Sequence, residues 1–461
     1  MKRTLAQFAR ACGGGQLAGT DAAYTEVVSD SRTLMRGELF VALKGPKFDG
    51  HEFVAAAHAR GAAGALVAAR QPVELPQIVV EDTQVALTRA AHAWRTLFTG
   101  PLIAVAGSNG KTTTKEMTAG ILGEAGACLA TRGNLNNHIG VPLTLLRLRP
   151  EQRFAVLELG ANRPGEVAAL TRLARPTTGV ITNAGAEHLE GFGSLEGVAR
   201  AEGEIVAGLD LAATAVINAD DEFASLWRGM SRARVVTFGL SESADFSAAE
   251  IGTALGAAGF RTHFRLRAPA GSVNIELALG GVHNIANALA AAAAAASAGA
   301  TLAQVAAGLA AVRAVPGRLE FKQAPGGAWV IDDSYNANPS SMRAAIEVLS
   351  SLGGRRWLAL GDMAELGPYA PQAHAAIGVL ARAAGVERLY ATGALMRSAV
   401  ESFGAGAQWF ADSGRLSAAL GAGLTEAGPG VRLLVKGSRF NRLERVVAAL
   451  TGERCADAGG H

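Results

Sequence analysis

Residues 101–114 combine the residue types that bind phosphate groups. An apolar run ends at Gly107, and a helix-like stretch begins at Lys111. Glycines let backbone N–H groups approach an oxygen atom closely, and a helix N-terminus adds free N–H groups and partial positive charge. Lys111 can reach the outer phosphates of a nucleotide, and the hydroxyl of Thr112 can ligate Mg²⁺. The pattern predicts a phosphate loop, in a shorter form than the standard Walker A motif, which has glycine where Val105 stands.

The loop itself supplies the residues that we expect to contact the nucleotide. They are Gly107, Ser108, Asn109, Gly110, Lys111, Thr112 and Thr113. The alternative for this segment is an ordinary glycine-rich turn. A strand-like run before the loop and a helix-like run after it are the context that a phosphate loop requires, and they favour the nucleotide site.

Two further candidate residues follow strand-like runs. In open α/β sheets, ligands bind beyond the carboxyl ends of the strands. Glu158 ends the apolar run 154–157, and its carboxylate could hold Mg²⁺ opposite Thr112. His188 comes after the run 179–182, where it could bind a metal ion or a phosphate oxygen. A single histidine is more often a hydrogen-bonding surface group, and that alternative stays open for His188.

The last third of the chain adds an arginine and a polar cluster. Arg318 follows a candidate linker at residues 315–317, and a guanidinium there could pair with a γ-phosphate only when two domains close. The alternative is a solvated linker arginine. Residues 332–339 are dense in short polar side chains and follow a strand-like run. They could form only a helix N-cap, but their place at the carboxyl end of a strand favours a binding site.

Composition limits the class of protein. The 461 residues are enough for about two to four domains, and a hydrophobic fraction of 49% indicates a globular chain. The net charge is +3 with no dense Lys/Arg run, so no nucleic acid partner is expected. Cys12, Cys128 and Cys455 are far apart and suggest no disulfide framework, which fits a reducing cytosol. Gln7 and Arg10 interrupt the first apolar run, so no signal peptide is predicted.

The uncharged segment 284–312 could be mistaken for a membrane span. Alanine gives little transfer energy, and polar breaks at Ser297, Thr301 and Gln304 fall within the segment. We predict instead two alanine-rich helices with a turn at residues 297–301, and no insertion into a membrane.

Three blocks are visible along the chain. Residues 1–82 hold short strand-like runs around a helix, whereas 83–314 and 315–461 alternate strands with helices. Such alternation predicts mainly parallel sheets covered by helices on both faces. The expected fold is α/β in three domains: a small α/β domain at 1–82, a central P-loop-type nucleotide-binding domain with a mainly parallel sheet at 83–314, and a C-terminal Rossmann-like domain at 315–461.

Together these segments resemble the Mur ligase family, and the resemblance covers essentially the whole chain. Besides the phosphate loop, it rests on residues 29–32, 37–45, 48–51, 134–144, 333–341, 360–367 and 435–439. One short segment could match by chance, but so many in the family's order form a specific signal. The Asp-Asn-Pro-Arg box with which one family member reads a diamino acid is absent.

The resemblance implies a ligase that uses ATP and Mg²⁺ to form an amide bond. The implied small-molecule substrates are UDP-MurNAc-tripeptide and D-Ala-D-Ala, joined through an acyl phosphate to give the pentapeptide precursor of peptidoglycan. The first domain would bind the UDP-sugar and its uridine nucleotide, and the third would bind the incoming dipeptide. The resemblance further implies a cytoplasmic enzyme, which we expect to be a monomer.

The resemblance also implies roles for individual residues. Lys111 and Arg318 would concentrate positive charge where two anions meet. Mg²⁺ would be held by Thr112 and Glu158, and His188 would help to hold a second ion. The remaining assignments are Asn284 and Asn287 near the adenine, Asp333 at the nucleotide, and Ser31, Arg32, Lys44, Asn134, Asn137, Tyr335, Asn336 and Asn338 at the substrates, with Asn336 and Asn338 on the dipeptide side.

One position departs from the family's pattern. Members usually carry a lysine, carbamylated by CO₂, in an Ala-Lys-x-Glu segment after the histidine motif, whereas this chain has Glu202 there. Glutamate keeps the negative charge but its reach is shorter by roughly 3.5–4 Å. We expect Glu202 to take the place of the carbamate in catalysis. The alternative is an exposed helix glutamate without a catalytic role.

Other functions stay open at this point. The nearest are another Mur ligase or a folylpolyglutamate synthase, although the latter should lack the first block. A nucleotide-driven conformational switch that makes no bond belongs to a different class, as does a nucleotide-sugar-binding regulator with an inactive ATP site. Phosphate release that requires an amine acceptor would separate a ligase from both.

Overall fold

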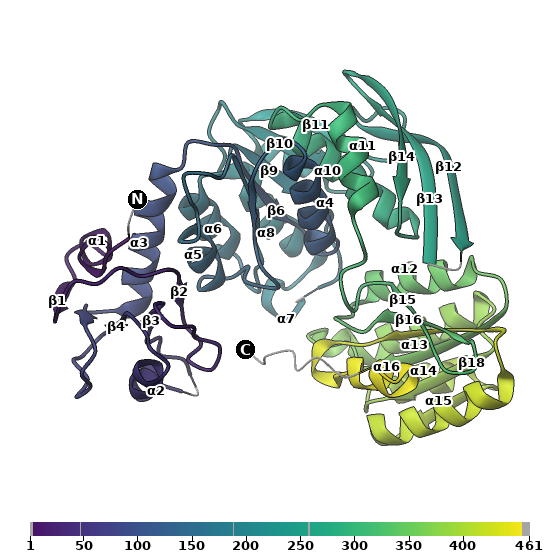
Figure 1. Cartoon of the computed structure of the whole chain (residues 1–461). Helices are drawn as coiled ribbons and strands as arrows, with labels where there is room; N and C mark the ends of the chain where they lie inside the picture. Colours follow the sequence, from purple (N-terminus) through teal and green to yellow (C-terminus); the bar gives the residue numbers. More distant parts are fainter. Residues whose placement is uncertain (1–2, 47, 188, 257–258, 454–461) are drawn as a thin grey trace.

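Three α/β units follow one another along the chain in the computed structural model (Figure 1). The structure describes residues 3–46, 48–187, 189–256 and 259–453. The N-terminal unit lies at one end, the middle unit in the centre, and the third unit against the other side of the middle unit. The α/β class and the three-part organisation expected from the sequence are confirmed.

The N-terminal unit is built on a five-stranded sheet in the order β1-β5-β4-β3-β2. Neighbouring strands run parallel except β1, which pairs antiparallel with β5. A capping box between Thr4 and Gln7 fixes the start of the first helix. The strands are β1 (Gln16–Ala18), β2 (Val27–Val28), β3 (Leu39–Val41), β4 (Gly64–Val67) and β5 (Gln77–Val79), and the helices are α1 (Leu5–Ala11) and α2 (Val54–Ala59).

The middle unit has a six-stranded, parallel sheet in the order β11-β10-β9-β6-β8-β7. β6 lies between β9 and β8, where the strand order reverses, and open sheets bind ligands at such a point. The strands are β6 (Leu102–Ala106), β7 (Cys128–Ala130), β8 (Phe154–Glu158), β9 (Thr178–Ile181), β10 (Thr214–Asn218) and β11 (Arg234–Phe238). The helices are α3 (Thr83–Leu97), α4 (Lys111–Gly123), α5 (Gly140–Leu145), α6 (Glu166–Ala174), α7 (Leu189–Phe192), α8 (Leu195–Ala207), α9 (Ala224–Met230), α10 (Val282–Ser297) and α11 (Leu302–Ala311).

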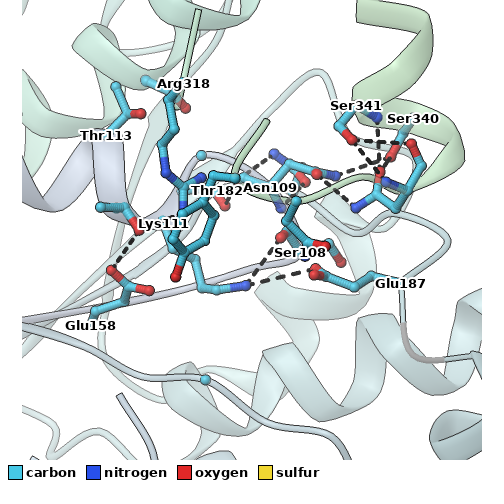
Figure 2. Close-up of a pocket in the computed structure, with 18 of the residues that line it drawn as sticks. Ser108, Asn109, Lys111, Thr113, Glu158, Thr182, Glu187, Arg318, Ser340 and Ser341 are labelled. Atoms are coloured by element: carbon cyan, nitrogen blue, oxygen red, sulfur yellow. Dashed lines mark hydrogen bonds and ion pairs between the residues drawn. The ribbon is translucent and has the colours of Figure 1, made fainter. Parts of the chain in front are cut away.

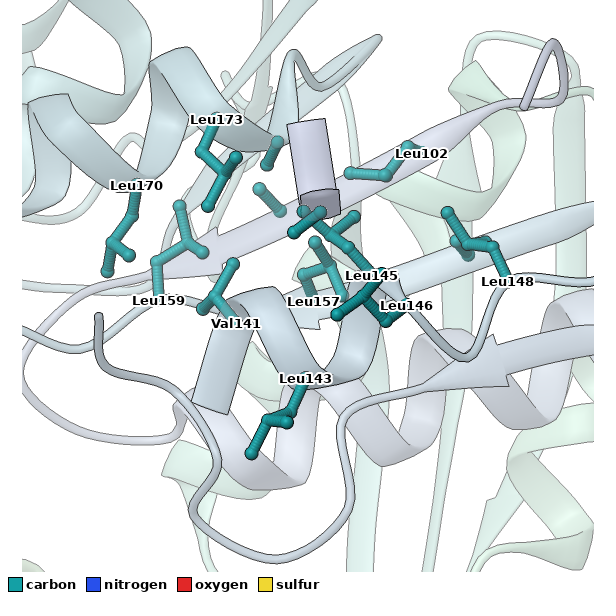
Figure 3. Packing of buried hydrophobic residues seen from close by; sticks show 14 of the residues in the cluster. Leu102, Val141, Leu143, Leu145, Leu146, Leu148, Leu157, Leu159, Leu170 and Leu173 are labelled. Carbon is teal, nitrogen blue, oxygen red and sulfur yellow. The ribbon is translucent and has the colours of Figure 1, made fainter. Parts of the chain in front are cut away.

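The core of the middle unit holds the carboxyl ends of β6 and β8 in place. Figure 3 shows side chains of α5 and α6, such as Leu143, Leu145, Leu170 and Leu173, in the same cluster as Leu157 of β8. Burying a side chain of this size stabilises the fold by about 1.5–3 kcal/mol. Because this packing is dense, the loops that leave the two strands start from fixed positions.

An antiparallel sheet of three strands is inserted into the middle unit. The alternation expected from the sequence does not include its strands, β12 (Ser247–Gly256), β13 (Gly259–Ala268) and β14 (Gly271–Leu277). Along β13, every second residue is buried, among them Phe260, Phe264 and Leu266, and the arginines between them are exposed. This period of two is visible in the sequence and is the signal of a half-buried strand.

The alanine-rich segment forms two helices, α10 and α11, as predicted. Ala290 and Ala295 on α10 are fully buried, as are the alanines between them. Small side chains let α10 pack closely against α4 and the sheet. In the part of the chain that the structure describes, no helix is long and apolar enough to cross a membrane.

The third unit has six strands in the order β15-β16-β20-β17-β18-β19, parallel except for β15. Its helix α12 starts at Pro339, where proline costs no helical hydrogen bond, and Asn338 caps it. The strands are β15 (Glu320–Gln323), β16 (Trp329–Asp333), β17 (Arg355–Gly361), β18 (Arg388–Thr392), β19 (Ala407–Phe410) and β20 (Val431–Lys436). The helices are α12 (Pro339–Ser350), α13 (Ala370–Ala383), α14 (Met396–Phe403), α15 (Ser413–Ala427) and α16 (Glu444–Thr451).

Candidate functional site

A cleft of about 790 Å³ lies between the middle and third units (Figure 2). Most residues expected at the nucleotide or its metal ion line it: Ser108, Asn109, Gly110, Lys111, Thr112, Thr113, Glu158, Asn284, Asn287, Arg318 and Asp333. Several residues expected at the substrates also line it: Asn134, Asn137, Tyr335, Asn336 and Asn338. The fold therefore gathers residues from distant parts of the chain around one space.

The phosphate loop joins β6 to α4 and depends on two glycines. Gly107 has a φ of 121° and Gly110 a φ of 82°, both in the region that favours glycine. A Cβ atom at Gly107 would lie 2.1 Å from Thr182 Oγ1, and one at Gly110 would lie 2.2 Å from Asn287 Oδ1. Any other residue at either position would strain the backbone and displace the neighbouring side chain, Thr182 or Asn287.

The ammonium group of Lys111 lies inside the loop. It donates to two carbonyl oxygens of the loop and is 3.8 Å from a carboxylate oxygen of Glu187 (Figure 2). Burial lowers the pKa of Lys111, but the neighbouring carboxylates, led by Glu187 and Glu202, raise this pKa by more, so the net shift is upward. Lys111 therefore stays charged at neutral pH, as binding of phosphate oxygens requires.

The carboxylate of Glu158 is buried and held on both oxygens. Oε2 accepts a hydrogen bond of 2.9 Å from Thr112 Oγ1, and Oε1 accepts one of 2.8 Å from Asn136 Nδ2. The fully buried ammonium of Lys115 lies 3.9 Å from Oε2. The two side chains predicted for Mg²⁺ are thus adjacent, and two further groups fix the carboxylate.

This set of oxygen atoms fits Mg²⁺. In nucleotide sites the ion is held by one or two carboxylates, by phosphate oxygens and by water, and a hydroxyl can join them. Among the described residues, no three His, Cys, Asp or Glu side chains form a group suited to a metal ion. Thr112 and Glu158 would therefore hold the ion together with the nucleotide. His188, predicted for a second ion, lies outside the described residues.

Glu202 projects from α8 to the phosphate loop. Its Oε2 accepts a hydrogen bond of 2.7 Å from the backbone N–H of Gly107. The side chain is only 4% exposed, so the alternative of an exposed helix glutamate is wrong. Its negative charge also contributes to the raised pKa of Lys111.

Arg318 reaches from the linker to the phosphate loop. Its Nη2 donates to Thr112 Oγ1 at 3.1 Å, and its guanidinium stacks 4.3 Å from the centre of the Tyr335 ring. Its Nε is buried and has no hydrogen-bond partner among the described residues, and the Arg318 side chain lines the cleft. The next residue, Leu319, has a φ of 53°, a strained conformation that is common at functional sites.

Asp333 is paired within the third unit. Its Oδ2 lies 2.6 Å from the ammonium of Lys436, and its Oδ1 accepts from the N–H of Leu319 at 3.2 Å. Lys436 also donates to the carbonyl oxygen of Asn336 at 2.9 Å. Through Lys436, these bonds fix the segments that carry Asp333 and Asn336 relative to each other.

The first turns of α10 line the cleft beside the phosphate loop. Asn287 accepts from Thr114 Oγ1 at 3.3 Å and donates to Asn284 Oδ1 at 3.2 Å. Burial, aided by the positive charge of Lys436, lowers the pKa of His283 to about 4. The His283 ring is therefore neutral at pH 7, on the middle-unit side of the cleft.

Some predicted ligand residues bond to the protein itself. Asn109 was expected at the nucleotide and Asn338 at the dipeptide, but Asn338 Nδ2 donates to Asn109 Oδ1 at 2.8 Å. Asn137 Oδ1 accepts from the N–H groups of Ile139 and Gly140 at the start of α5. Asn134 is exposed at the edge of the cleft.

Three predicted substrate residues lie in the N-terminal unit and do not line this cleft: Ser31, Arg32 and Lys44. Arg32 is exposed and lies 2.7 Å from a carboxylate oxygen of Asp30. The structure thus separates these residues from the phosphate loop.

Three residues of the site were not predicted from the sequence: Asn136, Asn183 and Lys115. The side chain of Asn183 holds the backbone of Asn109 through two hydrogen bonds of 3.0 Å. Asn136 and Asn183 follow or lie near strand ends, so their polar side chains could have marked them as candidate site residues in the sequence. Lys115 pairs with the adjacent Glu116 at 2.8 Å, and nothing local in the sequence marks its approach to Glu158, which is distant along the chain.

Three family models match the chain in order. They are described as "Mur ligase family, catalytic domain" at residues 23–95, "Mur ligase middle domain" at 105–295, and "Mur ligase, glutamate ligase domain" at 317–439. A relative from Escherichia coli (strain K12) is 45% identical over 95% of this chain and 96% of its own length. The chain belongs to the Mur ligase family.

The similar proteins agree on one member of that family. The Escherichia coli relative carries the name UDP-N-acetylmuramoyl-tripeptide–D-alanyl-D-alanine ligase. The structure of MurF from Acinetobacter baumannii matches with a TM-score of 0.90 and 34% identity, over 98% of this chain and 99% of that one. MurF ligase from Thermotoga maritima in complex with ADP matches with a TM-score of 0.81 and 27% identity, over 93% and 97%.

Proposed function

We propose that this protein is an ATP-dependent amide-bond ligase that adds D-Ala-D-Ala to UDP-MurNAc-tripeptide, forming the pentapeptide precursor of peptidoglycan. The observation that carries the proposal is similarity over the whole length to relatives of that name. The cleft supports it, because a phosphate loop, a carboxylate–hydroxyl pair and an arginine of the linker meet there.

The reaction requires two anions to meet. A carboxylate oxygen of the tripeptide attacks the γ-phosphorus of ATP, and the bond from that phosphorus to ADP breaks. The amine nitrogen of the dipeptide then attacks the carbonyl carbon of the acyl phosphate. Phosphate leaves with the electron pair of the C–O bond, and the amine loses a proton.

The residues of the cleft suit the first of these steps. Lys111 and Arg318 supply positive charge where the carboxylate approaches the phosphate. The guanidinium of Arg318, which lines the cleft, would bind a γ-phosphate oxygen. Because Arg318 belongs to the linker, this contact depends on the position of the third unit.

Mg²⁺ held by Thr112 and Glu158 would offset part of the charge on the phosphates. Asn136 and Lys115 hold the Glu158 carboxylate for this role. We expect Glu202 to act in place of the carbamylated lysine that the family resemblance implies, and its bond to the N–H of Gly107 positions the loop. His188 stays the predicted residue for a second ion.

The substrates would lie along the three units. We propose that residues 1–82 bind the uridine nucleotide, 83–314 bind ATP, and 315–461 bind the dipeptide. The expected contacts are Ser31, Arg32 and Lys44 for the uridine nucleotide, Asn134 and Asn137 for the nucleotide-linked peptide, Asn284, Asn287 and Asp333 for ATP, and Tyr335, Asn336 and Asn338 for the acceptor side. The enzyme would work in the cytoplasm as a monomer.

Phosphate release by the purified protein tests the proposal. The assay contains Mg-ATP and UDP-MurNAc-tripeptide, with D-Ala-D-Ala, with single amino acids, or without an acceptor. We expect release that requires the dipeptide and a pentapeptide product confirmed by mass. Release with a single amino acid would assign the protein to another ligation step, and release without any acceptor would contradict a ligase.

A further inference from the structure

Three side chains close a ring of hydrogen bonds between the phosphate loop and the start of α12. Asn338 Nδ2 donates to Asn109 Oδ1 at 2.8 Å, and Asn109 Nδ2 donates to Ser340 Oγ at 3.0 Å. Ser340 Oγ donates to Asn338 Oδ1 at 2.9 Å. Each of the three groups thus donates once and accepts once. Figure 2 shows Asn109 beside Ser340.

The ring closes with only one orientation of the Asn109 amide. If the amide were flipped, its NH₂ group would face the NH₂ group of Asn338, and its oxygen would face Ser340 Oγ, whose hydrogen already points to Asn338. Hydrogen bonds that follow one another in this way polarise and strengthen each other. The ring therefore acts as a unit, and the loss of one member weakens the other two bonds.

The loop side of the ring cannot move independently. The backbone N–H of Asn109 donates to Asn183 Oδ1 at 3.0 Å. Its carbonyl oxygen accepts from Asn183 Nδ2 at 3.0 Å and from Thr182 Oγ1 at 2.6 Å. With the backbone fixed, the Asn109 side chain sets where the start of α12 must lie.

The α12 side is equally rigid. Asn338 is 5% exposed and caps α12, because its Oδ1 also accepts from the N–H of Ser341 at 2.8 Å. Ser341 Oγ donates back to the Asn338 carbonyl oxygen at 3.0 Å. The same short segment includes Asn336, which Lys436 holds.

A glycine leaves room for the ring. A Cβ atom on Gly185 would lie 2.8 Å from Asn109 Nδ2 and 2.8 Å from Ser340 Oγ. The backbone of Gly185 is itself fixed by Ser108, whose Oγ accepts from its N–H at 2.8 Å. A side chain at this position would therefore push the two halves of the ring apart.

We infer that Asn109, Asn338 and Ser340 form an interdomain ring that docks the acceptor side of the cleft onto the phosphate loop, and that Asn109 is a positioning residue rather than a nucleotide ligand. The inference rests on the proposed ligase function. Docking through the ring places the acceptor amine at the carbonyl that phosphorylation has activated, and such alignment lowers the barrier to attack.

Asn109→Ala, Ser340→Ala and the double variant test the ring. Ser350→Ala, at the other end of α12, is the matched control. We expect each single variant to lower kcat/KM for D-Ala-D-Ala by about five- to tenfold, and the double variant to lower it no further than either single one. With Mg-ADP bound, small-angle scattering should show the same expansion in all three variants and none in the control.

A nucleotide ligand predicts a different pattern. Asn109→Ala would then weaken Mg-ADP binding while Ser340→Ala left it unchanged, and the effects on kcat/KM would multiply in the double variant. Either result would overturn the proposed role of the ring, as would variants that behave like the wild type. Gly185→Ala gives a second test without deleting a ring member, and it should reproduce the loss in kcat/KM and the expansion. Because scattering needs no turnover, the ring can be judged even if the wild type ligates no dipeptide and the proposed function fails.

Discussion

The carboxylate of Glu202 accepts a 2.7 Å hydrogen bond from the backbone N–H of Gly107. A helix of the middle unit thereby holds the first glycine of the phosphate loop. The bond also brings a negative charge close enough to Lys111 to contribute to its raised pKa. Glu202 therefore acts on both the backbone and the charge of the loop.

We expect Glu202→Gln to lower kcat by about 10- to 100-fold, the usual range for groups that orient a catalytic centre. The amide oxygen can still accept from Gly107, but the charge near Lys111 is lost. Steady-state phosphate release at several Mg²⁺ concentrations measures the effect. Glu196→Gln on the exposed side of the same helix is the control. An unchanged rate and Mg²⁺ dependence in Glu202→Gln would remove Glu202 from the mechanism.

Thr112→Ala should raise the Mg²⁺ concentration required for half-maximal activity. The variant lacks the hydroxyl that lies 2.9 Å from Glu158 Oε2, and loss of one ligand or its orienting partner typically costs about 10- to 100-fold in metal affinity. Thr112→Ser keeps the hydroxyl and should stay close to the wild type. Titration of activity with Mg²⁺, after treatment with a chelator, compares them. Equal Mg²⁺ requirements in the two variants would exclude Thr112 as a ligand.

Arg318→Lys should lower kcat by about 100-fold or more, although the positive charge remains. Lysine cannot stack on Tyr335 and bond to Thr112 as the planar guanidinium does. Tyr335→Phe keeps an aromatic face beneath Arg318 and should lose much less activity. Affinity for Mg-ADP, measured calorimetrically, should change little in Arg318→Lys because the missing contact is to the γ-phosphate. A drop in ADP affinity as large as the drop in kcat would contradict this role.

His283 should make stability depend on pH. Its pKa is 6.5 when unperturbed and about 4 in the folded protein. As pH falls from about 6.5 to 4, the unfolded chain takes up a proton at this residue and the folded protein does not. The contribution of His283 to the free energy of unfolding is therefore fully present above pH 6.5. It declines as the pH falls from 6.5 to 4 and changes no further below pH 4.

His283→Gln should remove this part of the pH dependence. The expected difference in the change of unfolding free energy between pH 7 and pH 4 is about 1 to 3 kcal/mol. Urea unfolding of both proteins across that range measures it, and His58→Gln, at an exposed position, is the control. Parallel curves for His283→Gln and the wild type would show that protonation of His283 is not linked to folding.

Much of the fold and the local parts of the site could be predicted from the sequence. The phosphate loop is a short contiguous segment, and its need for glycine at positions 107 and 110 follows from the turn between a strand and a helix. Alternating strands and helices predicted the parallel sheets, and small uncharged residues predicted α10 and α11. The antiparallel sheet β12-β13-β14 was missed although its period of two was present.

The sequence by itself determined which residues can do chemistry and that they follow strand ends. Only the tertiary structure decided which of them meet, because strand order and the docking of domains depend on packing across the whole chain. Glu202 contacts Gly107 from 95 positions away, and Asn338 contacts Asn109 from 229 positions away. Asn109 belongs by sequence to the nucleotide loop, but its side chain bonds to α12 because the third unit docks there.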